Sequence, residues 1–339
     1  MSNARKLADN LPTEGQLAGR NVIVNGAMTL SQRQTSSSNV GNKYVLDRFY
    51  VYKQNTGSTY TCSQNSVTDL AGFANSLKMD CTTADTSTAS NEEVYIQTKL
   101  EGQDLQRFQK GHSTALGFTL SFYVKTNKSG VYTVKMYDRD NNRDVSGSYT
   151  VADANWNRYT ISFPADTTGK FDDDNASSLE IFFSLVRGSD TTGGTLNTAW
   201  RTNSDASSAS GQVNFADSTS NDWEITGIQL EAGSQSSPFE HEQYLVSLAK
   251  CQRYFYSWVS SGLTDNIFIR SPYATGTPPN SSASASYTFP VTMRANPTMT
   301  TTYNYSRFTA SIHNAVAQIG TTSAGNAYAS TEWQADAEL

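Results

Sequence analysis

Hydrophobic residues that alternate with polar ones are the feature that most limits what this chain can fold into. Leu120, Phe122 and Val124 occupy one phase of such a run. A period of two places successive side chains on opposite faces of an extended strand, so the run predicts a half-buried β-strand. We expect it to form a hairpin with the next run across the turn at residues 128–130. The same period recurs in three further segments: Tyr132, Val134 and Met136; Tyr159, Ile161 and Phe163; and Leu179, Ile181, Phe183 and Leu185.

The composition agrees with a fold made of strands. Only 17% of the residues are charged and 37% are hydrophobic, while 18 Tyr and 15 Phe are present. Aromatic residues favour strands, and the abundant Ser, Thr and Asn favour turns and exposed strand faces over helix interiors. The sequence therefore predicts an all-β protein, and its 339 residues are enough for about two domains.

A break in the alternation identifies the kind of sheet. Trp223 and Ile225 keep one phase, whereas Ile228 and Leu230 fall in the other, with Gly227 at the change. A glycine at a phase change predicts a β-bulge. Bulged strands separated by turn-rich segments are typical of a jelly roll or another Greek-key sandwich, so we expect a jelly-roll β-sandwich here.

The pattern divides the chain into three parts. Residues 1–20 form a polar leader, which we expect either to be disordered or to order on docking to a larger assembly. Residues 21–243 form the jelly-roll β-sandwich. Residues 244–339 hold a smaller C-terminal β domain, joined to the sandwich by one helix over about residues 242–255, where Leu245, Leu248 and Ala249 have helical spacing.

Charge and hydropathy exclude several classes of protein. The net charge is −6 without a basic cluster, so we expect no nucleic-acid partner. No run approaches the roughly 18 apolar residues of a membrane span. Residues 1–20 lack the apolar centre of a secretion signal, which predicts that the chain is made in a cytoplasm and either stays there or leaves by lysis. Cys62, Cys81 and Cys251 match no metal-binding spacing, and we expect them reduced and buried, the alternative being a Cys62–Cys81 bridge.

Catalytic motifs are missing, so we expect no enzymatic activity. The three histidines are scattered, and neither a metalloprotease motif, a nucleophile elbow nor a phosphate-binding loop occurs. Glycoside cleavage needs two facing carboxylates, and nothing selects a pair from Glu92, Glu93, Asp138 and Asp140. A glycan-cleaving enzyme is therefore only a minor alternative.

One acidic run is a candidate metal site. Asp172, Asp173 and Asp174 offer oxygen ligands in a loop, which suits a structural Ca²⁺ ion, although the run lacks the glycine-containing EF-hand spacing. The alternative is a solvated acidic turn. The sequence predicts no other cofactor.

Aromatic residues outside the expected core are the candidate binding residues. Tyr95, Tyr123, Tyr137 and Trp200 fall on the polar phase of a strand or in a polar loop. Sugar rings stack on exposed aromatic faces, so these four residues are candidates for glycan binding. The alternative is that they cover the sandwich or pack in a subunit interface.

Four segments in a fixed order carry a resemblance to a known family. The segments are Asn21–Met28 (NVIVNGAM) followed by residues 32–33 and Leu46–Phe49 (LDRF); Val94–Gln103 (VYIQTKLEGQ); Trp223–Gly233 (WEITGIQLEAG) continued by Pro238–Glu240; and Cys251–Phe255 (CQRYF). Together they resemble tail-fibre and appendage proteins of bacteriophages, many of them from phages of marine bacteria and cyanobacteria, over most of residues 20–256.

The resemblance implies a fold and a location. It implies a jelly roll like that of carbohydrate-binding modules, a place in the virion, a homotrimer, and contact with glycans of the host surface. The N-terminal segment would then dock on other virion proteins. The alternative is a head decoration, collar or tail-adaptor protein that binds only other virion proteins. No sugar-binding residues transfer from the family to this chain.

Overall fold

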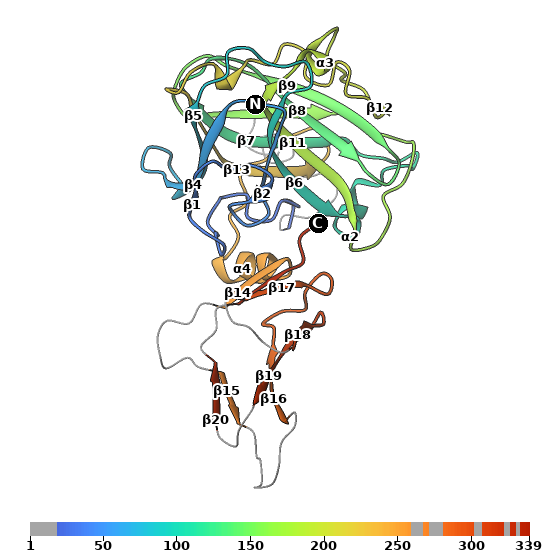
Figure 1. The fold of residues 1–339 in the computed structure, drawn as a ribbon. Coiled ribbons are helices and arrows are strands. Elements are labelled where there is room, and N and C mark those ends of the chain that lie inside the picture. Colours follow the sequence, from blue (N-terminus) through green and yellow to red (C-terminus); the bar gives the residue numbers. More distant parts are fainter. Residues whose placement is uncertain (1–18, 259–266, 271–280, 302–306, 322–325, 330–332) are drawn as a thin grey trace. The chain divides into compact units, whose positions relative to one another are not determined.

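The computed structural model describes residues 19–258, 267–270, 281–301, 307–321, 326–329 and 333–339. The chain divides between Gln243 and Tyr244 into two compact units (Figure 1). Nearly all of the predicted docking segment, residues 1–20, lies outside the described residues.

The first unit is a sandwich of two antiparallel sheets, which confirms the prediction of a jelly-roll β-sandwich (Figure 1). The six-stranded sheet has the order β1 (Ser36–Ser37), β4 (Thr59–Ser66), β5 (Asn75–Thr83), β13 (Asp222–Ala232), β7 (Phe118–Thr126) and β10 (Asn157–Phe163). The seven-stranded sheet has the order β12 (Arg201–Thr202), β9 (Arg143–Val151), β8 (Gly130–Asp138), β11 (Ser177–Arg187), β6 (Glu93–Glu101), β3 (Tyr50–Gln54) and β2 (Lys43–Tyr44). The connections hold the short helical turns α2 (Gly102–Leu105), η1 (Gln106–Phe108), α3 (Ser189–Thr192) and η2 (Phe215–Asp217).

The alternating hydrophobic residues form the core between the two sheets. Phe122 of β7 lies 5.3 Å, between ring centroids, from Phe183 of β11 in the opposite sheet. Trp223 of β13 is fully buried, and its indole Nε1 donates to the hydroxyl of Tyr149 on β9 over 3.3 Å. Full burial of each large apolar side chain contributes about 1.5–3 kcal/mol. The alternating apolar side chains seen in the sequence therefore hold the two sheets together.

Gly227 forms the predicted bulge. The register between β13 and β7 shifts between Thr226 and Gln229, and Gly227 has a φ of 62°. At the bulge the amide of Ile228 donates to the carbonyl of Gly26, so the N-terminal turn packs onto β13. A Cβ atom on Gly26 would lie 2.1 Å from the carbonyl oxygen of Ile228, and only glycine fits there.

The predicted hairpin is wrong. β7 and β8 lie in different sheets, where β7 pairs with β13 and β10, and β8 pairs with β9 and β11. Both strands are amphipathic, and their apolar faces meet across the core instead of lining one face of a single sheet. The short turn at residues 128–130 therefore crosses from one sheet to the other.

The two ends of the first unit are tied together. The Glu240 carboxylate accepts hydrogen bonds from the backbone amides of Gly19 and Asn21, at 2.5 and 3.0 Å. Partial burial alone would raise the pKa of Glu240, but these amides and the nearby Arg20 lower it overall. The carboxylate is therefore held in its charged form, where the chain enters and leaves the sandwich.

The second unit begins with the predicted helix, α4 (Tyr244–Gln252), and continues as strands. Trp333 is its largest buried side chain, and the rings of Tyr256 and Phe289 pack against it at centroid distances of 5.6 and 6.0 Å. The strands pair as β14 (Phe255–Trp258), β21 (Trp333–Asp336) and β17 (Thr298–Thr301); as β15 (Ile267–Arg270) with β20 (Asn326–Ala329); and as β16 (Ser281–Thr288), β19 (Asn314–Thr321) and β18 (Arg307–Ala310).

Cys62, Cys81 and Cys251 are buried and unbridged, as predicted, so the alternative Cys62–Cys81 disulfide is not formed. In the described part of the chain, every helix is too short or too polar to cross a membrane.

Candidate functional site

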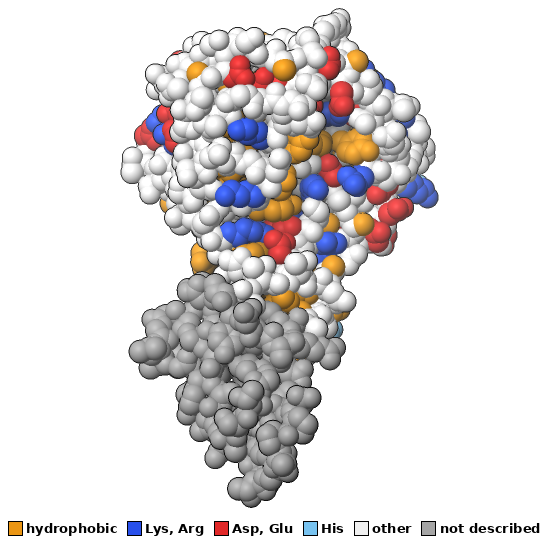
Figure 2. All heavy atoms as spheres, in the orientation of Figure 1, with side chains coloured by type: hydrophobic (Ala, Val, Ile, Leu, Met, Phe, Trp, Pro, Cys, Tyr) orange, Lys and Arg blue, Asp and Glu red, His pale blue; other side chains and the backbone are white. Residues whose placement is uncertain are grey.

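A groove lies on the outer face of the seven-stranded sheet, with a cavity volume of about 260 Å³. Figure 2 shows hydrophobic side chains on the first unit with Lys, Arg, Asp and Glu side chains next to them. The groove takes its residues from β6, β8 and β11 and from the loop that follows β12. Its lining consists of Glu93, Tyr95, Gln97, Lys135, Tyr137, Glu180, Phe182, Arg187, Asn203 and Asp205.

Strand register explains why these residues meet. Phe182 on β11 pairs with Lys135 on β8 and with Gln97 on β6, so the three side chains form one row across the outer face. Glu180 and Tyr137 pair in the next row, because side chains two residues apart share a face. The polar phase of each strand, which alternates with the core phase, therefore supplies the groove.

Two of the predicted aromatic residues, Tyr95 and Tyr137, lie in this groove. Tyr137 is half-buried, and its hydroxyl donates to Asn142 over 3.2 Å. Tyr95 is only 8% exposed, because the Tyr52 ring stacks on it at 4.6 Å and the Arg187 guanidinium lies over it at 4.8 Å. Tyr137 therefore offers a ring to a ligand, whereas Tyr95 supports its neighbours.

The groove floor is held in place by a buried carboxylate. Glu180 accepts hydrogen bonds from Gln97 Nε2 at 2.7 Å and from Arg139 Nη1 at 3.0 Å. Lys99 Nζ lies 3.9 Å from the same carboxylate. Hydrogen bonds that involve a charged group are stronger and shorter than neutral ones, so these contacts hold the Glu180 side chain in place.

One wall of the groove is a loop fixed by Lys135. The Lys135 ammonium donates to Asn203 Oδ1 and Asp205 Oδ1, each at 2.9 Å, and lies 3.7 Å from Asp144 Oδ2. Burial alone would raise the pKa of Asp205, but the hydrogen bond and the charge of Lys135 lower it overall. The wall therefore carries an ionised carboxylate in a fixed position.

The other end of the groove is closed by an ion pair between neighbouring strands. Arg187 Nη1 of β11 contacts Glu93 Oε1 of β6 at 2.5 Å, and Arg187 Nε donates to Ser184 Oγ at 3.1 Å. This arrangement leaves carboxylate, amide and hydroxyl groups beside an aromatic ring, a combination that suits hydrogen bonds to a hydroxyl-rich ligand.

Tyr123 and Trp200 lie elsewhere. Tyr123 is half-buried on β7 in the opposite sheet, and its ring packs against Phe73 at 5.2 Å. Trp200 packs on the core beside Phe118, at 5.7 Å, and its indole Nε1 donates to the carbonyl of Pro164 at 2.9 Å. The structure does not bring either residue together with Tyr95 and Tyr137. Trp200 covers the sandwich core, which is the alternative predicted for these aromatic residues.

The three aspartates of the predicted metal site are exposed and do not converge. Asp172, Asp173 and Asp174 follow one another in the loop before β11, and Asp174 Oδ1 accepts a hydrogen bond from the amide of Ala176. Among the residues that the structure describes, no group of three or more His, Cys, Asp or Glu side chains is arranged to hold a metal ion. The geometry of this loop is that of the alternative, a solvated acidic turn.

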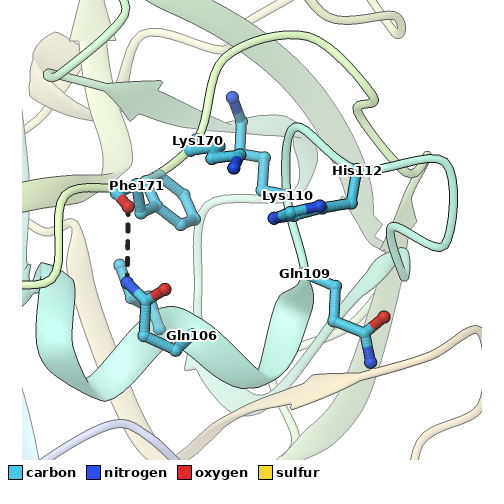
Figure 3. Close-up of a pocket in the computed structure, with 7 residues that line it drawn as sticks. Gln106, Gln109, Lys110, His112, Lys170 and Phe171 are labelled. Carbon is cyan, nitrogen blue, oxygen red and sulfur yellow. Dashed lines mark hydrogen bonds between the residues drawn. The ribbon is translucent and has the colours of Figure 1, made fainter.

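A smaller hollow of about 90 Å³ lies beside α2 and η1. Figure 3 shows the Gln106 amide, which donates to the carbonyl of Phe171, on one side of this hollow, and His112 and Lys170 on another. His112 and Lys170 are exposed surface residues, and the hollow has about a third of the groove volume. It is therefore a weaker candidate for a binding site.

Lys110, which also lines the smaller hollow, is fully buried in an ion network. Its ammonium contacts Asp138 Oδ2 at 2.5 Å and Asp166 Oδ2 at 3.1 Å, and donates to the carbonyls of Thr168 and Gly169 at 3.0 and 2.9 Å. Burial raises the pKa of Asp138 even though Lys110 opposes the shift. The network joins the loop after β10 to the end of β8 and has a structural role.

The sequence reasoning missed most of the groove. Phe182, Lys135, Glu180 and Arg187 were not among the candidate residues, although each is on the outward phase of β8 or β11. Phe182 was detectable, since it is a large apolar residue in the polar phase of an otherwise alternating strand. The charged residues gave no such signal, because charged side chains are common on exposed strand faces.

No family model matches the chain, and no curated protein matches it. Among solved structures, a family 11 carbohydrate-binding module from Clostridium thermocellum in complex with a β-1,3-1,4-mixed-linked tetrasaccharide is 12% identical, with a TM-score of 0.31, over 60% of this chain and 99% of that one. The CBM22-1 xylan-binding domain of Xyn10C from Paenibacillus barcinonensis is 11% identical, with a TM-score of 0.30, over 59% and 94%. A cyclase from Fischerella sp. TAU is 9% identical, with a TM-score of 0.35, over 64% and 99%. At these values none of the three assigns a function to this chain.

Proposed function

We propose that this chain is a structural subunit of a bacteriophage tail fibre or appendage, and that its first unit attaches the particle to the host by binding a saccharide. The observation that supports the binding role is the groove, where the half-buried ring of Tyr137 lies beside fixed carboxylate and amide groups. The virion role is supported by the sequence resemblance of residues 20–256. In this proposal the chain has no catalytic activity, resides in the virion and assembles as a homotrimer.

Weak binding at one groove is compatible with attachment. The groove is shallow and mostly polar, so a single contact buries little apolar area and gives low affinity. Several copies on one particle raise the overall affinity, because each later contact forms at a high effective concentration. The N-terminal segment would join the subunit to other virion proteins.

The proposal is tested by adding labelled full-length protein to cells of the phage host and measuring phage adsorption in competition. We expect saturable binding that reduces adsorption. The variant Tyr137→Ala should bind about threefold to tenfold more weakly, because it loses one aromatic contact.

Tyr123→Ala is the matched control, since it removes the same side chain from the opposite sheet. Equal losses in the two variants would show that the groove is not the site. Folded, assembled protein that binds no host cell would refute the attachment role and favour a decoration, collar or tail-adaptor protein that binds only virion proteins.

A further inference from the structure

The charges of the groove are matched within the protein. Arg187 pairs with Glu93, and Lys135 pairs with Asp205. Glu180 lies beside Arg139 at 3.0 Å. An acidic sugar would therefore meet cations that already have carboxylate partners, whereas an uncharged sugar can hydrogen-bond to these groups without breaking an ion pair.

Aromatic side chains continue beyond the groove on the same face. Tyr50 and Tyr52 lie on β3 and pair with Gln97 and Tyr95 of β6, so their side chains share the outer face with the groove lining. Both tyrosines are half-buried, and the pKa of each is raised, mainly by partial burial. Tyr44 on β2 pairs with Tyr50 and packs against it at 5.0 Å.

The two aromatic positions are too far apart for one sugar ring. Tyr137 is on β8 and Tyr50 is on β3, with β11 and β6 between them. Three strand spacings amount to about 14 Å, which is longer than a single pyranose ring. A ligand that touches both aromatic positions must be a chain of several sugar units that crosses the strands over the polar floor.

We propose that the groove binds an uncharged saccharide chain laid across β8, β11, β6 and β3, and that Tyr50 and Tyr52 form its second contact site. The inference rests on the proposed function, because it concerns the same face of the sheet. Tyr52 contributes a second time by stacking on Tyr95 at 4.6 Å, which couples the new contact site to the groove lining.

The test is calorimetric titration of the full-length chain with glucose against the β-1,3-1,4-mixed-linked tetrasaccharide, and with xylose against xylohexaose. Trigalacturonate serves as the acidic probe. We expect at least one of the two longer uncharged probes to bind more tightly than its monosaccharide and more tightly than trigalacturonate. Tyr50→Ala should weaken the longer probe about threefold to tenfold and leave the monosaccharide unchanged.

The outcomes separate this inference from the proposed function. Equal affinity for a monosaccharide and its longer counterpart, or a folded Tyr50→Ala chain that binds as the wild type does, would overturn the second contact site and leave glycan binding intact. Tighter binding of trigalacturonate would overturn the preference for an uncharged ligand. No binding of any probe would overturn this inference, whereas the proposed function fails only if the folded, assembled protein binds no host cell. If Tyr50→Ala does not fold, Tyr50→Leu removes the aromatic ring while filling most of its space.

Discussion

Replacement of Lys110 by methionine should destabilise the first unit strongly. The lysine is fully buried, and its removal leaves two nearly buried carboxylates, Asp138 and Asp166, without their ammonium partner. Breaking a buried ion pair by removing one partner costs about 3–5 kcal/mol, because an uncompensated charge stays behind. For a unit of this size, 1 kcal/mol corresponds to a Tm change of about 2–4 °C, so we expect a fall of about 6–20 °C.

The assay is thermal unfolding of the full-length chain, followed by calorimetry and by circular dichroism. Lys125→Met is the matched control, because it makes the same substitution at an exposed ion pair with Asp69, where the side chains are 34% and 54% exposed. Exposed pairs contribute about 0–1 kcal/mol, so the control should melt close to the wild type.

The comparison isolates burial, since the two variants lose the same charge and gain the same side chain. If Lys110→Met and Lys125→Met melted within 2 °C of each other, our reasoning on the buried network would be refuted. A large effect of Lys110→Met that disappeared in the double variant with Asp138→Asn would instead show that the stranded charge is the cause.

Two further predictions concern the bulge and the buried carboxylate. Gly227→Ala should lower stability by about 1–3 kcal/mol, because the φ of 62° is strained for alanine and its Cβ would lie 2.8 Å from Phe73 and Tyr123. Gly19→Ala is the control, because its φ of 69° carries a similar strain while its Cβ would meet no atom within 4 Å, so it should cost less in the same denaturant titration. The pKa of Asp166 lies below its usual value of 3.8, because hydrogen bonds from Arg143 and Lys110 outweigh its burial. Its charged form therefore adds stability above that value. The Tm difference between the wild type and Asp166→Asn should be largest near neutral pH and should shrink to zero as the pH falls through the lowered pKa. A Tm difference that grew as the pH fell would contradict this prediction.

The core was predictable from the sequence, but the pairing of strands was not. Leu120, Phe122 and Val124 are all buried, as their period of two required. The same period occurs in β7 and β8, and it does not say whether two neighbouring strands share a sheet or face each other across a core. Whether two neighbouring strands share a sheet depends on the topology of the whole domain, which the local alternation of residues does not determine.

The site was harder to predict because topology assembles it from distant segments. Its residues come from β6, β8, β11 and the loop at residues 203–205, and only the strand order brings them side by side. Tyr137 was identified because an aromatic side chain in the polar phase is unusual. Trp200 gave the same signal, but its loop folds back over Phe118, so an aromatic residue in a polar segment is not always exposed.

The hydrogen bonds from Gly19 and Asn21 to Glu240 affect how the first unit can be joined to other segments and how it responds to force. Because the two ends of the first unit lie next to each other, the sandwich can be inserted into a longer chain or removed from it with little change in the separation of the flanking segments. A force applied to the two ends would first load the hydrogen bonds from the amides of Gly19 and Asn21 to Glu240, so these bonds would break before the two sheets are disturbed.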